Sequence, residues 1–205
     1  MKNILYVDSF AMIGKRGLKD ELSVWKTENL IDEMDFCGIH AALVTHGLCR
    51  EYDPQFANRL LMEEVKKSNR LIPSWSALPH YLHEFPKPSE FVKMMNDNNV
   101  RAVSLFPRSH NYTLNTTVCG ELLNELEKNE IPVLLTFSRL QNGMQQTTFE
   151  EVDTVCSAFP NLKIILQSVW WNLTRDLIPY MHKHKNIYVE FASLQANRII
   201  EFLID

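Results

Sequence analysis

Seven short runs of apolar and β-branched residues, which begin about 30 residues apart, constrain the fold of this chain more than any other feature. Runs of this length and composition are typical of buried β-strands. The gaps between them have helical spacing, and a helix that connects neighbouring strands of a sheet makes them parallel. The runs are Asn3 to Asp8, Ile39 to Thr45, Leu71 to Ser76, Val100 to Leu105, Pro132 to Thr136, Leu162 to Gln167 and Asn186 to Glu190. The pattern predicts an α/β protein.

Signals for the start of a helix strengthen this prediction. Asp53 precedes Pro54, Pro88 precedes an apolar helical pattern, and Thr147 with Glu150 has the spacing of a capping box. Each of these signals follows one predicted strand and precedes the next. The chain is therefore expected to repeat a strand-helix unit seven times.

The number of units favours a barrel over an open sheet. Seven units exceed what a flavodoxin-like sheet normally uses and approach the eight of a closed barrel, which takes roughly 250 residues. We expect a TIM-like (β/α) barrel that forms a single domain over residues 1–205. Only one helical stretch, Gln195 to Leu203, follows the last predicted strand, so the barrel is expected to be truncated before its eighth strand. An open barrel would leave unpaired edges on its first and seventh strands.

Charge and cysteine content narrow the classes of partner and location. The net charge is -4 and the isoelectric point is about 6.0, so the chain lacks the basic field that binds nucleic acid or anionic membranes. The apolar run Ile4 to Val7 is too short for a signal peptide or a membrane span, which predicts a cytoplasmic location. The four cysteines lie far apart, so we expect them to be reduced and mostly buried.

Three segments carry a resemblance to a known family. Val7 to Gly14 (VDSFAMIG) looks like a first-strand Asp-x-His-x-His-x-Gly motif, and Ile131 to Thr136 (IPVLLT) and Phe159 to Ser168 (FPNLKIILQS) look like later strand segments. In these segments the chain resembles the amidohydrolase-related (amidohydrolase family 2) group of metal-dependent hydrolases and decarboxylases. The resemblance spans nearly the whole chain. It implies the barrel fold and small carboxylate or lactone substrates.

The metal ligands that the resemblance implies are replaced in this sequence. The paired first-strand histidines fall on Phe10 and Met12, the fifth-strand histidine on Thr136 and the sixth-strand histidine on Ser168. A catalytic zinc ion needs about three nitrogen, sulfur or oxygen ligands from the protein, which these residues do not supply. We therefore expect no metal and no other cofactor.

Polar and aromatic residues at the carboxyl ends of the predicted strands are the candidates for a replacement site, because chemistry in this fold belongs there. The catalytic candidates are Asp8, His46, His110 and Glu190. The substrate-binding candidates are Trp75, Arg108, Arg139, Gln167 and Trp170, and Ser138 and Trp171 share their face. Arginine offers a planar fork for a carboxylate and tryptophan an apolar wall, so the set favours a carboxylate pocket.

Each candidate also has a structural alternative. The arginines can pair with nearby acids, the histidines can be hydrogen-bonded structural residues, and Asp8 and Glu190 can bond backbone amides at strand ends. Two histidine doublets are weaker candidates. His182 and His184 end a helix on the stability face of the barrel, and His80 and His83 lie in the loop from Pro79 to Pro88 without an evident third ligand.

Three hypotheses about function remain open. The protein is a hydrolase or decarboxylase of a small carboxylate or lactone that works without the usual metal, or an inactive relative that binds a small molecule or a partner protein. Alternatively, the chain is an incomplete gene product. The sequence is also compatible with assembly of the chain into a homo-oligomer. Fold alone does not choose among them, because function depends on the site.

Overall fold

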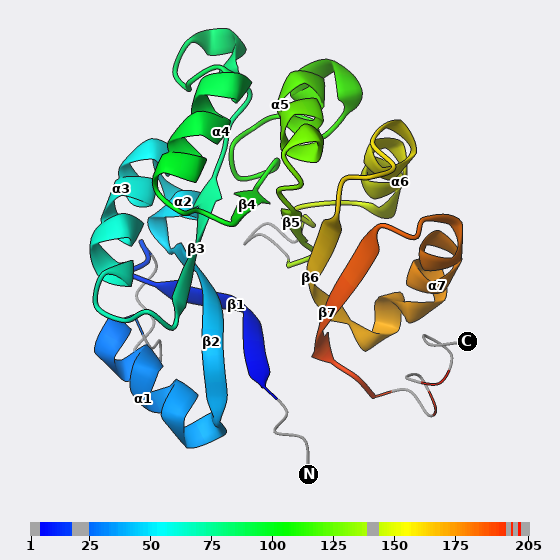
Figure 1. Ribbon diagram of the computed structural model, residues 1–205. Helices are drawn as coiled ribbons and strands as arrows, with labels where there is room; N and C mark the ends of the chain where they lie inside the picture. Colours follow the sequence, from blue (N-terminus) through cyan, green and yellow to red (C-terminus); the bar gives the residue numbers. More distant parts are fainter. Residues whose placement is uncertain (1–4, 18–24, 139–143, 196–197, 199–200, 202–205) are drawn as a thin grey trace. The chain divides into compact units, whose positions relative to one another are not determined.

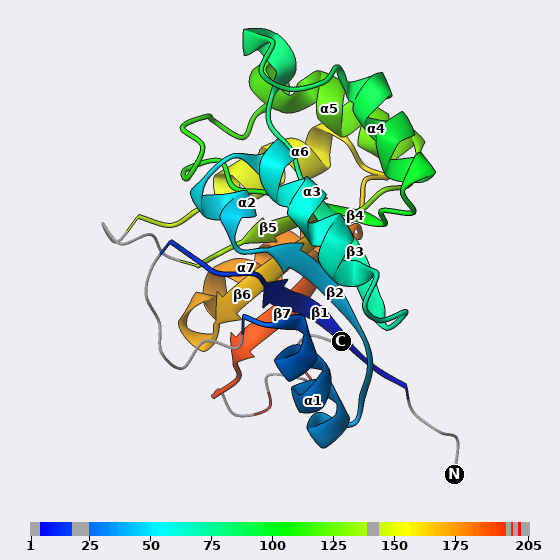
Figure 2. The ribbon, with the colours of Figure 1, turned by 90° about the vertical axis from the view of Figure 1, so that its left-hand side faces the viewer.

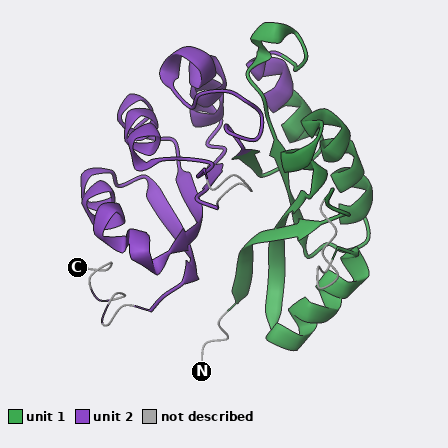
Figure 3. Ribbon diagram, turned by 180° about the vertical axis from the view of Figure 1, so that it is seen from behind, with its two compact units in different colours: residues 1–86, 93–104 green, residues 87–92, 105–205 purple. Residues whose placement is uncertain are grey.

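The computed structural model describes residues 5–17, 25–138, 144–195, 198 and 201. The chain divides into two compact units, which Figure 3 colours separately. Unit 1 comprises residues 1–86 and 93–104, and unit 2 comprises residues 87–92 and 105–205. Seven strands alternate with helices along the chain (Figure 1), which confirms the predicted α/β class and its seven βα units.

Unit 1 contains a parallel sheet in which the strands follow the order of the chain. Its strands are β1 (Tyr6–Ile13), β2 (Ile39–His46), β3 (Leu71–Ser76) and β4 (Ala102–Leu105), of which the last residue is assigned to unit 2. Its helices are α1 (Thr27–Cys37), α2 (Leu48–Glu51), α3 (Pro54–Val65) and the 3₁₀ turn η1 (His80–Leu82). Helix α3 packs on β2 and β3 and lies in front of them in Figure 2. Helix α4 (Pro88–Asp97) begins in unit 2 and ends in unit 1.

Unit 2 contains a second set of parallel strands, β5 (Val133–Thr136), β6 (Ile164–Trp170) and β7 (Ile187–Ser193), again in chain order. Its helices are α5 (Thr116–Lys128), α6 (Phe149–Ala158), the 3₁₀ turn η2 (Trp171–Leu173) and α7 (Thr174–Lys183). All four residues of β5 are buried, as are the four of β4. Burial of both alternating sets of side chains is typical of parallel strands covered by helices on one face and core on the other.

Helix caps explain where several helices begin. Asp53 caps α3 by accepting a hydrogen bond from the Gln55 backbone at 2.8 Å, with Pro54 in the first turn as predicted. The predicted capping box of Thr147 and Glu150 is wrong by one residue. Thr148 and Glu151 form the box, in which the Glu151 backbone donates to the Thr148 hydroxyl at 3.3 Å and the Thr148 backbone donates to the Glu151 carboxylate at 3.0 Å.

Two strands, β1 and β6, extend beyond their predicted ends, and each continues through a shift in register. β1 was expected to end at Asp8 but continues to Ile13, with a shift in its register against β2 between Asp8 and Ala11. β6 was expected to end at Gln167 but continues to Trp170, with a shift against β7 after Leu166. A bulge inserts an unpaired residue without ending the strand, so the alternation of apolar residues is interrupted there. β7 likewise extends past Glu190 to Ser193.

Three further features of the sequence can be compared with the structure: the cysteines, the helix lengths and the C-terminal segment. Cys49, Cys119 and Cys156 are buried and Cys37 is exposed, and all four are free thiols, as expected. None of the described helices is both long and apolar enough to span a lipid bilayer. The helix expected from Gln195 to Leu203 lies largely outside the described residues.

Candidate functional site

A pocket of about 530 Å³ opens in unit 2 at the carboxyl ends of β5 and β6. This volume lies within the range of ligand pockets in proteins, roughly 300 to 1,000 Å³. The described lining consists of Phe137, Ser138, Gln145, Trp170, Trp171, Asn172 and Leu173. The carboxyl end of parallel strands is the edge at which barrel proteins place their ligands, so this pocket is the candidate site.

The two tryptophans project from a fixed turn. Trp170 is the last residue of β6 and pairs in register with Ser193 of β7, and Trp171 opens the 3₁₀ turn η2. The buried Thr174 hydroxyl donates a hydrogen bond to the Trp171 carbonyl oxygen, which closes the turn. Both residues are nevertheless exposed, Trp170 by 51% and Trp171 by 43%. The turn therefore presents apolar aromatic surface on a rigid backbone.

The opposite part of the lining follows β5. Phe137 is only 2% exposed and lies 4.7 Å from Phe149, which stacks on Tyr180 at 5.2 Å between ring centroids. This aromatic row connects the pocket to α6 and α7. The Phe137 backbone donates to the Gln167 carbonyl oxygen at 2.8 Å, so the loop after β5 continues the pairing with β6.

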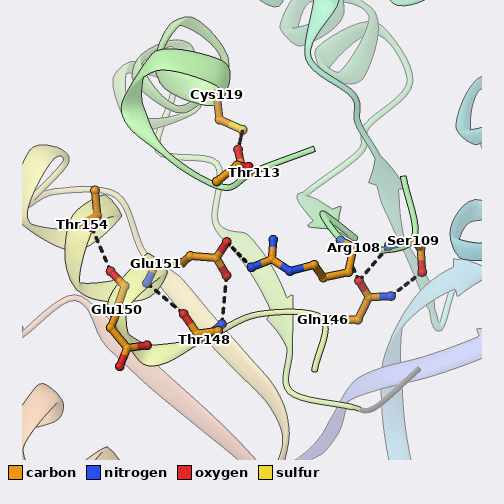
Figure 4. A network of polar contacts seen from close by, with 9 residues as sticks. All are labelled: Arg108, Ser109, Thr113, Cys119, Gln146, Thr148, Glu150, Glu151 and Thr154. Carbon is orange, nitrogen blue, oxygen red and sulfur yellow. Dashed lines mark hydrogen bonds and ion pairs between the residues drawn. The ribbon is translucent and has the colours of Figure 1, made fainter. Parts of the chain in front are cut away.

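Gln146 holds together the loops that follow β4 and β5 (Figure 4). Its side-chain oxygen accepts hydrogen bonds from the Arg108 and Ser109 backbones, both at 3.1 Å, and its amide group donates to the Ser109 hydroxyl. Its own backbone donates to the Ser138 carbonyl oxygen at 3.1 Å. Because Gln146 is fully buried and adjoins Gln145 of the pocket, this network fixes the position of one wall.

Arg108 forms an ion pair inside the same network. Its guanidinium Nη2 lies 2.8 Å from Glu151 Oε1, and Glu151 is also the capping residue of α6 (Figure 4). The two side chains are 25% and 11% exposed. Arg108 was a candidate either for binding a carboxylate ligand or for pairing with a nearby acid. The structure shows it paired with an acid, Glu151. Arg139, the other arginine, lies outside the described residues.

The candidates in unit 1 have structural surroundings. Asp8 does not end β1, as was expected; its carboxylate accepts a hydrogen bond from the Phe10 backbone at 2.8 Å, beside the bulge. Trp75 is buried within β3. His46 does end β2, and its Nδ1 accepts a hydrogen bond from the Leu48 backbone at 3.2 Å. The His46 ring lies against Gly14, so it has little freedom to move.

His46 should make the stability of the protein depend on pH. Burial lowers the pKa of His46, and the opposing influence of Glu64 is smaller. A histidine whose pKa is depressed by folding contributes stability above its unfolded pKa of about 6.5, and this stability is lost as the pH falls toward the folded pKa. We expect the urea midpoint to fall between about pH 7.5 and about pH 5.5. The variant His46→Asn keeps an acceptor near the Nδ1 position and should show a flatter dependence; an equally steep one would assign the effect to another group.

The candidates in unit 2 surround β6. Glu190 lies inside β7, and its carboxylate accepts a hydrogen bond from the Ser168 backbone at 2.6 Å, at the bulge of β6. Gln167 is buried next to Ser168, and His110 lies half-buried with its ring 6.1 Å from that of Phe106. Of the substrate-binding candidates that the structure describes, Trp170 alone lines the pocket. Ser138 and Trp171, predicted on the same face, line it too.

The residues at the implied metal positions do not fit a divalent metal. Phe10 and Met12 lie in β1 and offer no nitrogen or carboxylate donor, and Thr136 shares its hydroxyl in hydrogen bonds with the Ser138 backbone and hydroxyl. Ser168 adopts a left-handed backbone conformation at the bulge, with φ of 56°. Within the described part of the chain, no group of three or more His, Cys, Asp or Glu side chains is close enough to hold a metal.

The histidine doublets have local roles. His184 follows α7, and its Nε2 lies 2.6 Å from Asp153 on α6, so the pair connects the two helices. The bond to His184, together with Lys183, lowers the pKa of Asp153. His80 opens η1, and His83 ends it with a positive φ of 61°. Neither doublet belongs to a three-ligand group among the described residues.

Several residues of the site were not anticipated from the sequence. Gln145 and Asn172 line the pocket, and Gln146 and Glu151 hold its loops. Glu151 carried a signal, because a capping-box spacing from Thr148 was present beside the one from Thr147. Gln146 carried none, since its partners are two backbone amides and one hydroxyl in a loop that is distant in the sequence.

Solved structures with the same fold clarify what the chain resembles. No protein-family model and no curated protein matches it. A 5-carboxyvanillate decarboxylase from Sphingomonas paucimobilis is 11% identical with a TM-score of 0.69, and the match covers 98% of this chain and 84% of that one. An uncharacterized TIM-barrel protein from Bordetella bronchiseptica is 17% identical with a TM-score of 0.68, covering 91% and 74%. An amidohydrolase II is 12% identical with a TM-score of 0.66, covering 97% and 82%. At these identities the likeness concerns the fold alone. The chain has a TIM-like (β/α)-barrel fold with seven units, and amidohydrolase and decarboxylase structures have a similar fold.

Proposed function

We propose that this protein is a hydrolase or decarboxylase that acts on a small carboxylate or lactone without a divalent metal. The observation that carries the proposal is the pocket at the carboxyl ends of β5 and β6, the edge used for chemistry in barrel enzymes. The solved structures with this fold include one named for a carboxylate substrate, 5-carboxyvanillate. The substituted ligand positions support chemistry by protein side chains alone.

Two groups in unit 2 are the candidates for acid or base catalysis. Glu190 is fixed by its bond to the Ser168 backbone two residues before Trp170, and His110 follows β4. A carboxylate or an imidazole within reach of the substrate can transfer a proton and accelerate a reaction about 10²-fold to 10⁴-fold. In the proposal, Ser138, Gln145 and Asn172 bind the polar atoms of the substrate.

A second candidate function is binding without turnover. The observation that favours it is the described lining of the pocket, in which no side chain is a carboxylate, an imidazole or an amine. In this alternative the pocket retains a small carboxylate or lactone, and the protein is an inactive relative of barrel enzymes.

Turnover by protein dialysed against EDTA tests both candidates. One substrate is a lactone, dihydrocoumarin, and opening of its ring is measured. The other is an aromatic carboxylate, 2,6-dihydroxybenzoate, and release of carbon dioxide from it is measured. We expect activity that persists without metal and falls at least about 100-fold in Glu190→Gln, which keeps an acceptor for the Ser168 backbone. Binding detected by calorimetry without turnover would support the second candidate. Activity that requires added zinc or manganese would refute the metal-free proposal.

A further inference from the structure

The chemistry of the pocket walls limits what part of a ligand it can hold. Its described lining has three aromatic side chains, one leucine, one hydroxyl and two carboxamides. No charged side chain of either sign is among them. A carboxylate buried against this lining would lose its hydration without gaining an ionic partner, which is unfavourable. The described walls therefore suit an uncharged part of a molecule.

The exposed tryptophans add a preference for a flat ring. Indole faces form favourable stacked or edge-to-face contacts with other π-systems beyond the gain from burying apolar area. Trp170 and Trp171 keep roughly half of their surface exposed although a closed turn fixes their backbone. Phe137 also lines the pocket, but it is only 2% exposed and its ring packs on Phe149. The backbone that carries the two indoles is already fixed before a ligand binds, so binding of a flat ring costs the protein little backbone entropy.

From these observations we infer that the pocket between the β5 and β6 loops binds an uncharged, flat, unsaturated ring against Trp170 and Trp171. The inference rests on the proposed function, since the ring is the uncharged part of the proposed carboxylate or lactone substrate. Ser138, Gln145 and Asn172 offer hydrogen bonds to a carbonyl or hydroxyl substituent on the ring. Any carboxylate of the ligand points away from the described walls.

Four probes separate the ring from the carboxylate. Benzoate and benzyl alcohol carry a flat ring, whereas cyclohexanecarboxylate and cyclohexylmethanol carry a saturated one, and one member of each pair is charged. Binding is measured by calorimetry and by quenching of tryptophan fluorescence. We expect each flat ring to bind about fivefold to tenfold more tightly than its saturated counterpart.

Three variants locate the effect. Trp170→Leu and Trp171→Leu should each weaken the flat probes about tenfold and leave the saturated probes nearly unchanged. Trp25→Leu is the matched control, because Trp25 is 37% exposed but lies in unit 1, outside the pocket. It should change binding by less than about twofold.

The outcomes distinguish this inference from the proposed function. If both carboxylates bind equally and the pocket variants have no effect, the inference fails while the proposed carboxylate function stands. If benzyl alcohol binds in a Trp170-dependent way and neither carboxylate binds, the inference stands and the carboxylate function fails. Absence of binding by both flat probes would overturn the inference.

Discussion

Replacing Gly14 by alanine is expected to destabilise the protein by about 3 kcal/mol or more. Gly14 follows β1 with a φ of +82°, and an alanine Cβ there would lie 2.0 Å from His46 Nε2. The left-handed conformation alone costs alanine about 1 to 2 kcal/mol. The remainder comes from the clash, because His46 is buried and its ring is held by the Leu48 backbone. Urea unfolding followed by circular dichroism measures the change.

Gly38→Ala is the matched control for this prediction. Gly38 has a similar φ of +69°, but an alanine Cβ there would meet nothing within 4 Å. Its substitution should therefore cost only the backbone strain, about 1 kcal/mol. In a His46→Ala background, Gly14→Ala should likewise cost only about 1 kcal/mol, since the clashing ring is gone. Equal losses from Gly14→Ala and Gly38→Ala in the wild-type background would show that the contact with His46 contributes nothing.

The contrast between β3 and β1 shows what could be predicted from this sequence about the fold. β3 matches its predicted range, Leu71 to Ser76. β1 extends beyond its predicted end, because the polar Asp8 lies inside the strand. Its carboxylate instead bonds the backbone of a bulge, and the strand resumes to Ile13. A polar residue after an apolar run gives the same sequence pattern whether the strand ends there or the residue bonds the backbone within a longer strand.

The candidate site was predictable where it depends on strand order and not where it depends on loop contacts. Ser138, Trp170 and Trp171 were expected on the carboxyl edge because they follow apolar strands. Gln146 could not be found in this way, since it bonds backbone groups 37 and 38 residues away. The capping box was predicted one residue early because Thr147 with Glu150 and Thr148 with Glu151 have the same spacing. The two hydrogen bonds between Thr148 and Glu151 identify the second pair as the box.

Replacing Glu151 by alanine is expected to cost about 2 to 3 kcal/mol. The carboxylate performs two tasks, accepting the Thr148 backbone hydrogen bond at 3.0 Å and pairing with Arg108 at 2.8 Å (Figure 4). Alanine removes both and leaves a partly buried guanidinium without its carboxylate. Calorimetric melts should record a lower Tm, by about 4 to 12 °C for a chain of this size.

Two substitutions separate the cap from the ion pair. Glu151→Gln retains an oxygen that can accept the Thr148 backbone bond but cannot neutralise Arg108, so it should cost about half as much as alanine. Glu150→Gln is the matched control, because Glu150 lies in the same turn of α6, is exposed and has its side chain outside the network. Its effect should stay within about 0.5 kcal/mol. If the alanine and glutamine variants at position 151 were equally destabilised, the ion pair would account for the whole effect and the cap for none. Because the same contacts hold the loops after β4 and β5, Glu151→Ala should also weaken binding of a ring in the adjoining pocket, whereas Glu150→Gln should not.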